Sequence, residues 1–260
     1  MFYRGLTLED LINKEKAGIR YACSKEDRNI LDSMFSEINL RLGTDLHYLA
    51  ELDYYYYYDI GDILLRYVDC FSSEEVKAYL IPQLVWNKVK NCSQIILRLY
   101  MNFKKTKDYV SNDPDVTIPI CYRYDDAFKH LRSRKIKEQL LELAHNPRDV
   151  YYLFNSVKML ASWRIPEMET LLKEYIDSEH YTPEDFLIFD TDDKCVMNEF
   201  RVMKLYLNDV GLYGLRYYPT RDNYNLVASF LSSESELKRD LATKTLSKMN
   251  YFANKNNERM

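Results

Sequence analysis

The chain contains few of the residues that interrupt regular structure: six glycines and seven prolines among 260 residues. Because glycine and proline are the strongest breakers of helices and strands, most of the chain must lie in regular segments. Strictly alternating apolar and polar runs, the pattern of half-buried strands, are scarce as well, whereas apolar residues recur at helical spacing. These absences argue against a sheet and predict an all-α protein.

Cysteine pairs and targeting segments are also missing. The five cysteines stand apart, without a CxxC pair, and fit neither a disulfide framework nor a zinc-ligand spacing. The first residues lack a basic start followed by an apolar stretch, and no run approaches the ~18 uncharged apolar residues that cross a bilayer. We therefore expect a cytoplasmic protein with reduced thiols and no membrane segment.

The sequence lacks the motifs of common catalytic and cofactor sites. Its four histidines are far apart, and it has no HExxH, GxxxxGK[ST], GxGxxG or GxSxG pattern. The run Asp190-Thr-Asp-Asp193 has the acids of a calcium loop, but Cys195 stands where that loop needs glycine and Arg201 where it needs glutamate. We predict no metal, no cofactor and a function other than catalysis.

The charge balance is slightly acidic, with 40 Asp and Glu against 36 Lys and Arg. Nonspecific binding of nucleic acid needs cations that neutralise phosphates, so this balance argues against nucleic acid as the main ligand. A local patch can nevertheless differ from the average of the chain.

A repeated segment is the most informative feature that the chain does contain. Residues 68–84 and 160–176 each have an apolar helix end, an aromatic residue three positions later (Phe71 or Trp163), a short polar turn, and then apolar residues at every fourth position. A looser copy, one residue longer at the turn, covers residues 228–241. Since such a helix pair buries its apolar face only against a neighbour, the repetition predicts stacked helix pairs, an α-solenoid.

The spacing of the two good copies, 92 residues from Val76 to Met168, is close to two units of ~40 to 47 residues. With an acid or proline in the turn and apolar residues every fourth position after it, the pattern resembles the HEAT family of armadillo-type helical repeats. The resemblance implies a right-handed α-solenoid of irregular HEAT-like helix pairs. We expect one domain over residues 1–260, with a soft boundary in the proline-containing loop 109–119.

Local patterns set several expected helix boundaries. Ser24 stands three residues before an acid, and Asn146 precedes a proline, so both are predicted helix N-caps. One continuous helix is expected over residues 147–163. Gly211 and Gly214 are expected to end the helix that begins near residue 193.

The strongest candidate binding site is a run of five tyrosines, Tyr54, Tyr55, Tyr56, Tyr57 and Tyr58, followed by Asp59. On a helix, five consecutive rings point in every direction, so either some are exposed or the helix breaks there. Tyrosine anchors many protein interfaces. Packing of these rings between helix layers is the alternative explanation.

A second candidate is the acidic segment 177–199, which holds eight acids against one lysine, Lys194. Asp190, Asp192 and Asp193 lie at its centre. Together with Asp59, these acids favour a basic partner, because complementary charge steers and orients association.

We therefore predict a non-enzymatic module that binds a partner protein through this tyrosine- and acid-rich surface. Two alternatives stay open. One family of HEAT-like proteins of similar length excises alkylated bases from DNA, and Trp86, Trp163 and Glu167 are the only counterparts here of its tryptophan and carboxylate residues, although its tryptophan–aspartate pattern is missing. The other alternative is a structural homo-oligomer with the tyrosines at the subunit interface.

Overall fold

The fold is all-helical in the residues that the computed structural model describes, which are 7–16, 24–55, 59–110, 114–131, 133–187 and 194–257. No strand occurs in these ranges. The predicted all-α fold class is thus confirmed. The chain divides between Ser133 and Arg134 into two compact units.

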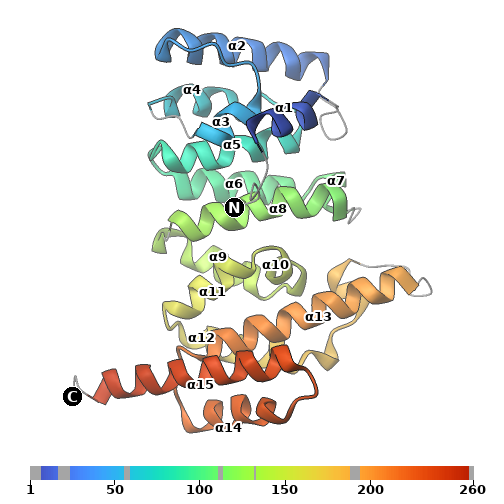
Figure 1. Ribbon diagram of the computed structural model, residues 1–260, viewed down its shortest axis with the longest axis vertical. Helices are drawn as coiled ribbons and strands as arrows, with labels where there is room; N and C mark the ends of the chain where they lie inside the picture. The colour runs from blue at the N-terminus through green and yellow to red at the C-terminus, as the bar shows by residue number, and fades with distance from the viewer. Residues whose placement is uncertain are drawn as a thin grey trace. The chain divides into compact units, whose positions relative to one another are not determined.

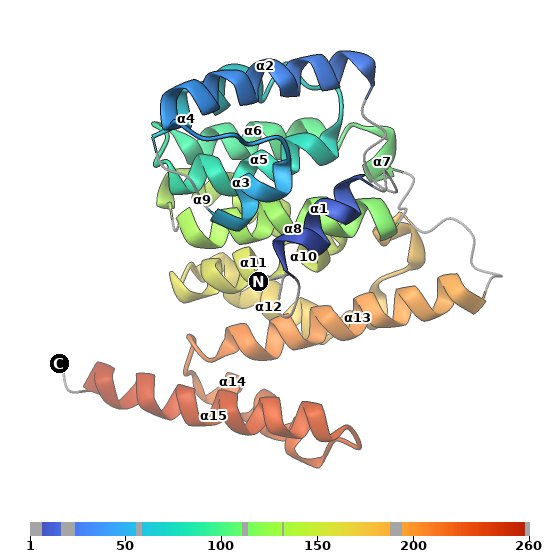
Figure 2. The ribbon, with the colours of Figure 1, turned by 45° about the horizontal axis from the view of Figure 1, so that its top comes forward.

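The first unit stacks its helices side by side. Figures 1 and 2 show α2, α4, α5 and α8 following one another, with α1 against α3 and α6 beside α5. The helices are α1 (Leu8–Lys16), α2 (Lys25–Leu42), α3 (Leu49–Tyr55), α4 (Gly61–Tyr67), α5 (Glu74–Trp86), α6 (Cys92–Phe103), α7 (Lys107–Val110) and α8 (Pro114–Leu131).

The core of the first unit forms around α5, which contacts α3, α4, α6 and α8. Because helices cover it on several sides, α5 buries residues around its circumference, including Val76, Leu80 and Ile81. An aromatic cluster fills the space between α6 and α8, where the ring centroid of Tyr124 lies 5.1 Å from that of Tyr100. The central helix is therefore held by packing on several sides.

The predicted N-caps at Ser24 and Asn146 are confirmed. The Ser24 side chain accepts a hydrogen bond from Asp27 N at 3.0 Å, and Asn146 Oδ1 accepts from Arg148 N and Asp149 N at 3.0 and 3.2 Å. These bonds satisfy backbone donors that have no partner within the helix.

Residues 114–119, which we expected in a loop, are instead the first part of α8. Pro114 occupies the first helical position, where its missing N–H is harmless, and Pro119 is accommodated inside the helix. Burial of Thr117, Ile120 and Cys121 along one face outweighs the local signal of the prolines. The division between compact units lies farther along the chain than the expected soft boundary.

The second unit contains helices on both sides of the long helix α13, which packs extensively on α12 and also contacts α11, α14 and α15 (Figure 1). The α-helices are α9 (Lys137–Ala144), α10 (Pro147–Tyr152), α11 (Phe154–Ser162), α12 (Pro166–Ile176), α13 (Lys194–Leu215), α14 (Arg221–Ser229) and α15 (Glu236–Asn257). Four 3₁₀ turns accompany them, η1 (Arg134–Ile136), η2 (Ser178–His180), η3 (Pro183–Phe186) and η4 (Phe230–Ser232).

The single helix expected over residues 147–163 is wrong, because Leu153 separates α10 from α11. Leu153 has φ −111° and ψ 33°, outside the helical range, while its side chain is buried. Nothing in the local sequence marks this break, so tertiary packing decides it.

The expected helix end at Gly211 and Gly214 is also wrong, since α13 continues to Leu215. Both glycines face α12 at very short range. A Cβ at position 211 would lie 2.6 Å from the carbonyl oxygen of Leu172, and one at position 214 would lie 2.4 Å from Leu172 Cδ2. Glycine is used here for close helix packing and not for helix termination.

The repeated segments form helix pairs, α4–α5, α11–α12 and, for the looser copy, α14–α15. In the first two copies the apolar residues after the turn are buried, Val76 and Leu80 in one and Met168 and Leu172 in the other. The third copy differs, since 83% of Leu237 is exposed. The helix–turn–helix prediction is confirmed for the copies, and the first two bury matching positions.

Candidate binding surface at the tyrosine segment

The tyrosine segment begins at the end of α3, where Tyr54 and Tyr55 are the last helical residues. Their side chains, and the whole of Tyr56, Tyr57 and Tyr58, lie outside the described residues. Asp59 is described and exposed, whereas Asp190, Asp192 and Asp193 lie outside the described residues. The described residues that bear on this segment are therefore the ones that contact the chain directly before and after it.

Two glutamates hold the amino-terminal end of α3. The Glu15 carboxylate, from α1, accepts hydrogen bonds from Leu49 N at 3.0 Å and Ala50 N at 2.9 Å. Glu51 accepts from His47 N and Tyr48 N at 2.7 and 2.8 Å. Because the first N–H groups of a helix lack intrahelical partners, these carboxylates supply the missing acceptors and favour the positive end of the helix.

A buried glutamine holds the last turn of α3. Gln83 lies inside α5, is fully buried, and donates from Nε2 to the carbonyl oxygen of Leu52. Leu49 and Leu52 of α3 are buried as well. A buried polar bond of this kind fixes orientation, because an alternative packing would leave the amide and the carbonyl unpaired. The helix that leads into the tyrosines is thus fixed at both ends.

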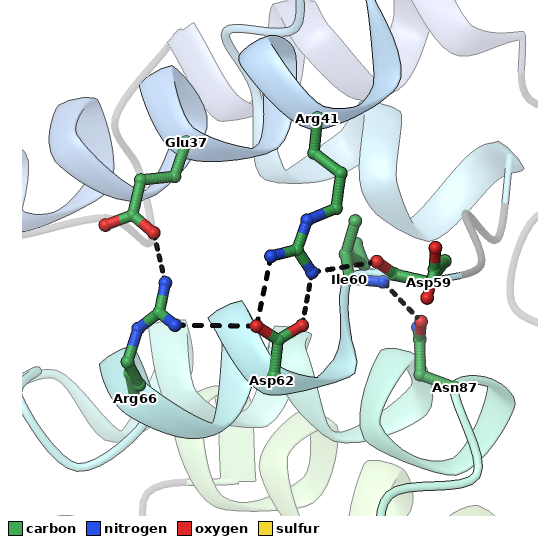
Figure 3. A network of polar contacts seen from close by, with 7 residues as sticks. All are labelled: Glu37, Arg41, Asp59, Ile60, Asp62, Arg66 and Asn87. Atoms are coloured by element: carbon green, nitrogen blue, oxygen red, sulfur yellow. Dashed lines mark hydrogen bonds and ion pairs between the residues drawn. The ribbon is translucent and has the colours of Figure 1, made fainter.

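The chain is fixed again directly after the tyrosines (Figure 3). Asp59 has φ 64°, in the left-handed region that only a few non-glycine residues adopt. Its carbonyl oxygen accepts a hydrogen bond from Arg41 at 3.1 Å, and Ile60 N donates to Asn87 Oδ1 at 2.8 Å. Asn87 is itself tied to Gln83 O through Nδ2 at 2.8 Å. The backbone on either side of residues 56–58 is therefore anchored to α2 and α5.

An ion-pair network joins α2 to α4 next to Asp59 (Figure 3). Arg41 donates to both carboxylate oxygens of Asp62, and Arg66 bridges Asp62 and Glu37. The hydrogen bond from Tyr67 lowers the pKa of Glu37, and the bond from Arg41 lowers that of Asp62. These side chains are substantially exposed, so the network orients the surface more than it stabilises the fold.

The acids that accompany the tyrosines are largely paired within the first unit. Asp62 binds Arg41 and Arg66, and Asp69 binds Arg98 through two hydrogen bonds of 2.8 and 2.7 Å. Asp59 instead offers an exposed carboxylate beside the tyrosines. Of these acids, Asp59 is the one best placed to meet a partner.

Sequence reasoning missed the supporting residues Glu15, Arg41, Gln83 and Asn87. Gln83 had a detectable signal, since it is the one uncharged polar residue in the apolar run from Tyr79 to Trp86. Glu15 and Arg41 act over distances in sequence that no local pattern encodes. The sequence therefore reveals the tyrosines, and the fold is needed to find the residues that contact the chain on either side of them.

We expect Glu15→Gln to change how stability depends on pH. Burial is the main cause that raises the pKa of Glu15 above its usual 4.5, so its favourable contribution is full below that value and declines as pH rises through the higher folded pKa. The wild type therefore loses some stability as pH rises from acid to neutral. Glutamine does not titrate in this range, so the free energy of unfolding of the variant minus that of the wild type should increase from acid to neutral pH. Urea unfolding at both pH values measures this; a relative change in the opposite direction would contradict it.

The residues of the enzyme alternative lie in different surroundings. Trp86, in the first unit, is 41% exposed and its ring centroid lies 6.5 Å from that of His130. In the second unit, the Arg134 guanidinium lies 5.8 Å from the ring of Trp163, and Glu167 is exposed in the first turn of α12. No cluster of His, Cys, Asp and Glu able to hold a metal occurs in the described ranges.

The described residues form an all-helical fold in which the backbone is anchored before and after the tyrosine segment. Comparison with known proteins gives no match among family models, curated proteins or solved structures. Within the part of the chain that is described, no helix combines the length and apolarity needed to cross a membrane.

Proposed function

We propose that the protein is a non-enzymatic, cytoplasmic helical-repeat protein, a right-handed solenoid of HEAT-like helix pairs, that binds a partner protein through Tyr54 to Tyr58 and Asp59. The single observation that carries this proposal is the anchoring around the tyrosines. Glu15 and Gln83 fix the helix before them, and Arg41 and Asn87 fix the backbone after them. Fixed ends reduce the entropy that a connecting segment can lose when a partner binds, and this favours affinity.

The composition of the segment supports a protein partner. Tyrosine supplies a large amphipathic contact area with few rotatable bonds, which is why it dominates many interface hot spots. The exposed carboxylate of Asp59, and the acids Asp190, Asp192 and Asp193 in the second unit, favour a basic partner. Asp62 and Asp69 are neutralised by Arg41 and Arg98 within the first unit, so they add less negative charge to the binding surface than Asp59 does.

The test is a triple variant, Tyr55→Ala/Tyr56→Ala/Tyr57→Ala. The tagged wild-type protein is used to capture its partner, which is then purified and titrated against both proteins by calorimetry. We expect the triple variant to bind at least about 30-fold more weakly, because truncation of even one hot-spot aromatic costs about 2 kcal/mol or more. Circular dichroism must show that the variant keeps its helical fold.

Tyr251→Ala is the matched control, because it removes an exposed aromatic ring from the second unit. It should bind the partner as the wild type does. Unchanged binding by the triple variant would reject the tyrosine surface. A wild-type protein that self-associates in light scattering, with the triple variant monomeric, would establish the homo-oligomer instead.

A further inference from the structure

The second unit has three stretches of sequence that contain cations and no acids. Residues 150–166, 210–221 and 241–257 contain seven Lys and Arg and no Asp or Glu, in a chain of net charge −4. These stretches cover α11, the last turns of α13 and most of α15. The average charge of the protein therefore conceals a local cationic region.

Contacts between rings and cations bring the three stretches together. Lys158 Nζ of α11 lies 4.9 Å from the ring centroid of Tyr213 in α13. The Arg164 guanidinium, just after α11, lies 5.2 Å from the ring of Phe252 in α15, and Tyr217 faces the same ring at 5.3 Å between centroids. We call this surface, the cations Lys158, Arg164, Arg216 and Lys248 with the rings they face, the aromatic–cationic edge.

Arg216 is the most unusual member of the edge. Its guanidinium stacks 3.5 Å from the ring centroid of Tyr213. Within the described residues its buried Nε has no hydrogen-bond partner and no carboxylate forms an ion pair with it. Burial also lowers its pKa. A partly desolvated arginine without an anion gains more from an anionic ligand than a fully hydrated cation does.

The outer part of the edge is accessible. Tyr251 is 55% exposed, and Lys248, also exposed, lies 5.6 Å from its ring centroid. Acids also border the edge: Asp240 is bound to Lys244 at 2.5 Å, Asp209 acts on Lys158, and Glu167 and Glu169 act together with Arg164 on Tyr218. Within the described residues, Arg216 and Lys248 are cations of the edge that form no ion pair with a carboxylate.

We infer that the aromatic–cationic edge binds single-stranded nucleic acid, with phosphates at Arg164, Arg216 and Lys248 and a base stacked on Tyr251. Cations that follow the phosphates, interleaved with aromatic rings that stack on bases, are the general means of binding single strands without sequence preference. An acidic peptide would pair with the charges, but its carboxylates have no planar ring to stack on Tyr251, whereas every nucleotide brings both a phosphate and a base. The combination of charge and rings thus favours nucleic acid over an acidic protein.

The experiment measures fluorescence anisotropy of a labelled oligonucleotide of about twelve nucleotides with the full-length protein. Three phosphate contacts predict a slope of about −2 in log affinity against log salt, hence a loss of about 20-fold between about 50 and about 200 mM salt. A duplex of the same sequence should bind more weakly, because its bases are already stacked. Poly-glutamate serves as the acidic competitor and should displace the oligonucleotide poorly.

Variants separate charge from stacking. Arg216→Ala/Lys248→Ala should weaken binding and reduce the salt slope by about 1.4, since each lost phosphate contact removes about 0.7. Tyr251→Ala should weaken binding by about 5- to 150-fold with the slope unchanged. If the Arg216 substitution disturbs folding, Lys248→Ala alone and Tyr251→Ala still decide the question.

Lys90→Ala/Lys105→Ala is the matched control, because it removes two exposed cations from the first unit and should leave binding unchanged. The proposal is overturned by an absence of binding at low salt, by equal loss in the control, or by poly-glutamate that competes as well as the oligonucleotide. The tyrosine variant of the first unit should still bind the oligonucleotide, so failure of the protein-binding proposal and failure of this one are distinguishable.

Discussion

Replacing Asp27 by alanine is expected to lower the free energy of unfolding by about 3 kcal/mol. Asp27 is 1% exposed, and its carboxylate accepts hydrogen bonds from Ser72 N, Ser72 Oγ and Ser73 N at 2.8, 2.7 and 3.0 Å. These bonds tie the first turn of α2 to the turn between α4 and α5. Alanine would remove a buried carboxylate that three donors of Ser72 and Ser73 share, at the start of the central helix of the unit. Urea unfolding followed by circular dichroism measures the loss.

Asp32→Ala is the control for this prediction, because Asp32 lies on the same helix, is exposed and carries the same charge. Its effect should stay within about 0.5 kcal/mol. Asp27→Asn keeps one acceptor oxygen and should fall between the two. Equal effects of Asp27→Ala and Asp32→Ala would show that the buried bonds contribute nothing beyond the loss of a charge.

The sequence predicts the helices well where local chemistry determines their ends. Ser24 and Asn146 cap helices as expected, because a side-chain oxygen at that position satisfies the first free N–H groups. It fails where packing overrides the local signal. Leu153 breaks a helix without a breaker residue, and Pro119 lies within a helix because the face beside it is buried.

The candidate site was predictable only in part. Five adjacent tyrosines are conspicuous in any sequence, and Asp59 beside them is exposed as a binding residue must be. The supports of the segment come from α1, α2 and α5, which are distant in the chain, so no local pattern could connect Glu15 or Gln83 to it. The pairing of Asp62 with Arg41 likewise depends on the packing of α2 on α4. Features set by neighbouring residues can be predicted from sequence, whereas polar contacts between distant segments can be found only once the fold is known.

Alanine at Gly211 is expected to destabilise the second unit by about 2 kcal/mol, although alanine is the better helix former by about 1 kcal/mol. The added Cβ would lie 2.6 Å from the backbone oxygen of Leu172 and 2.7 Å from Ile176 Cγ1. A backbone oxygen cannot move aside, so α13 would have to separate from α12. Thermal unfolding compared with the wild type measures the effect; a stabilised variant would contradict the role in close packing.

Gly214→Ala should also destabilise the unit, but for a reason that a second substitution can remove. Here the obstructing atoms are Cδ2 and Cδ1 of Leu172, at 2.4 and 2.8 Å from the new Cβ. Leu172→Ala alone should cost about 2 to 5 kcal/mol, because Leu172 is fully buried. In that background Gly214→Ala should become neutral or stabilise by up to about 1 kcal/mol, since the obstruction is gone and the helix preference remains.

Gly211→Ala should stay destabilising in the Leu172→Ala background, because the atom that obstructs its Cβ is a backbone oxygen. A double-mutant cycle for each glycine with Leu172 therefore separates the two contacts, and equal coupling in both cycles would refute this account of the α12–α13 contact.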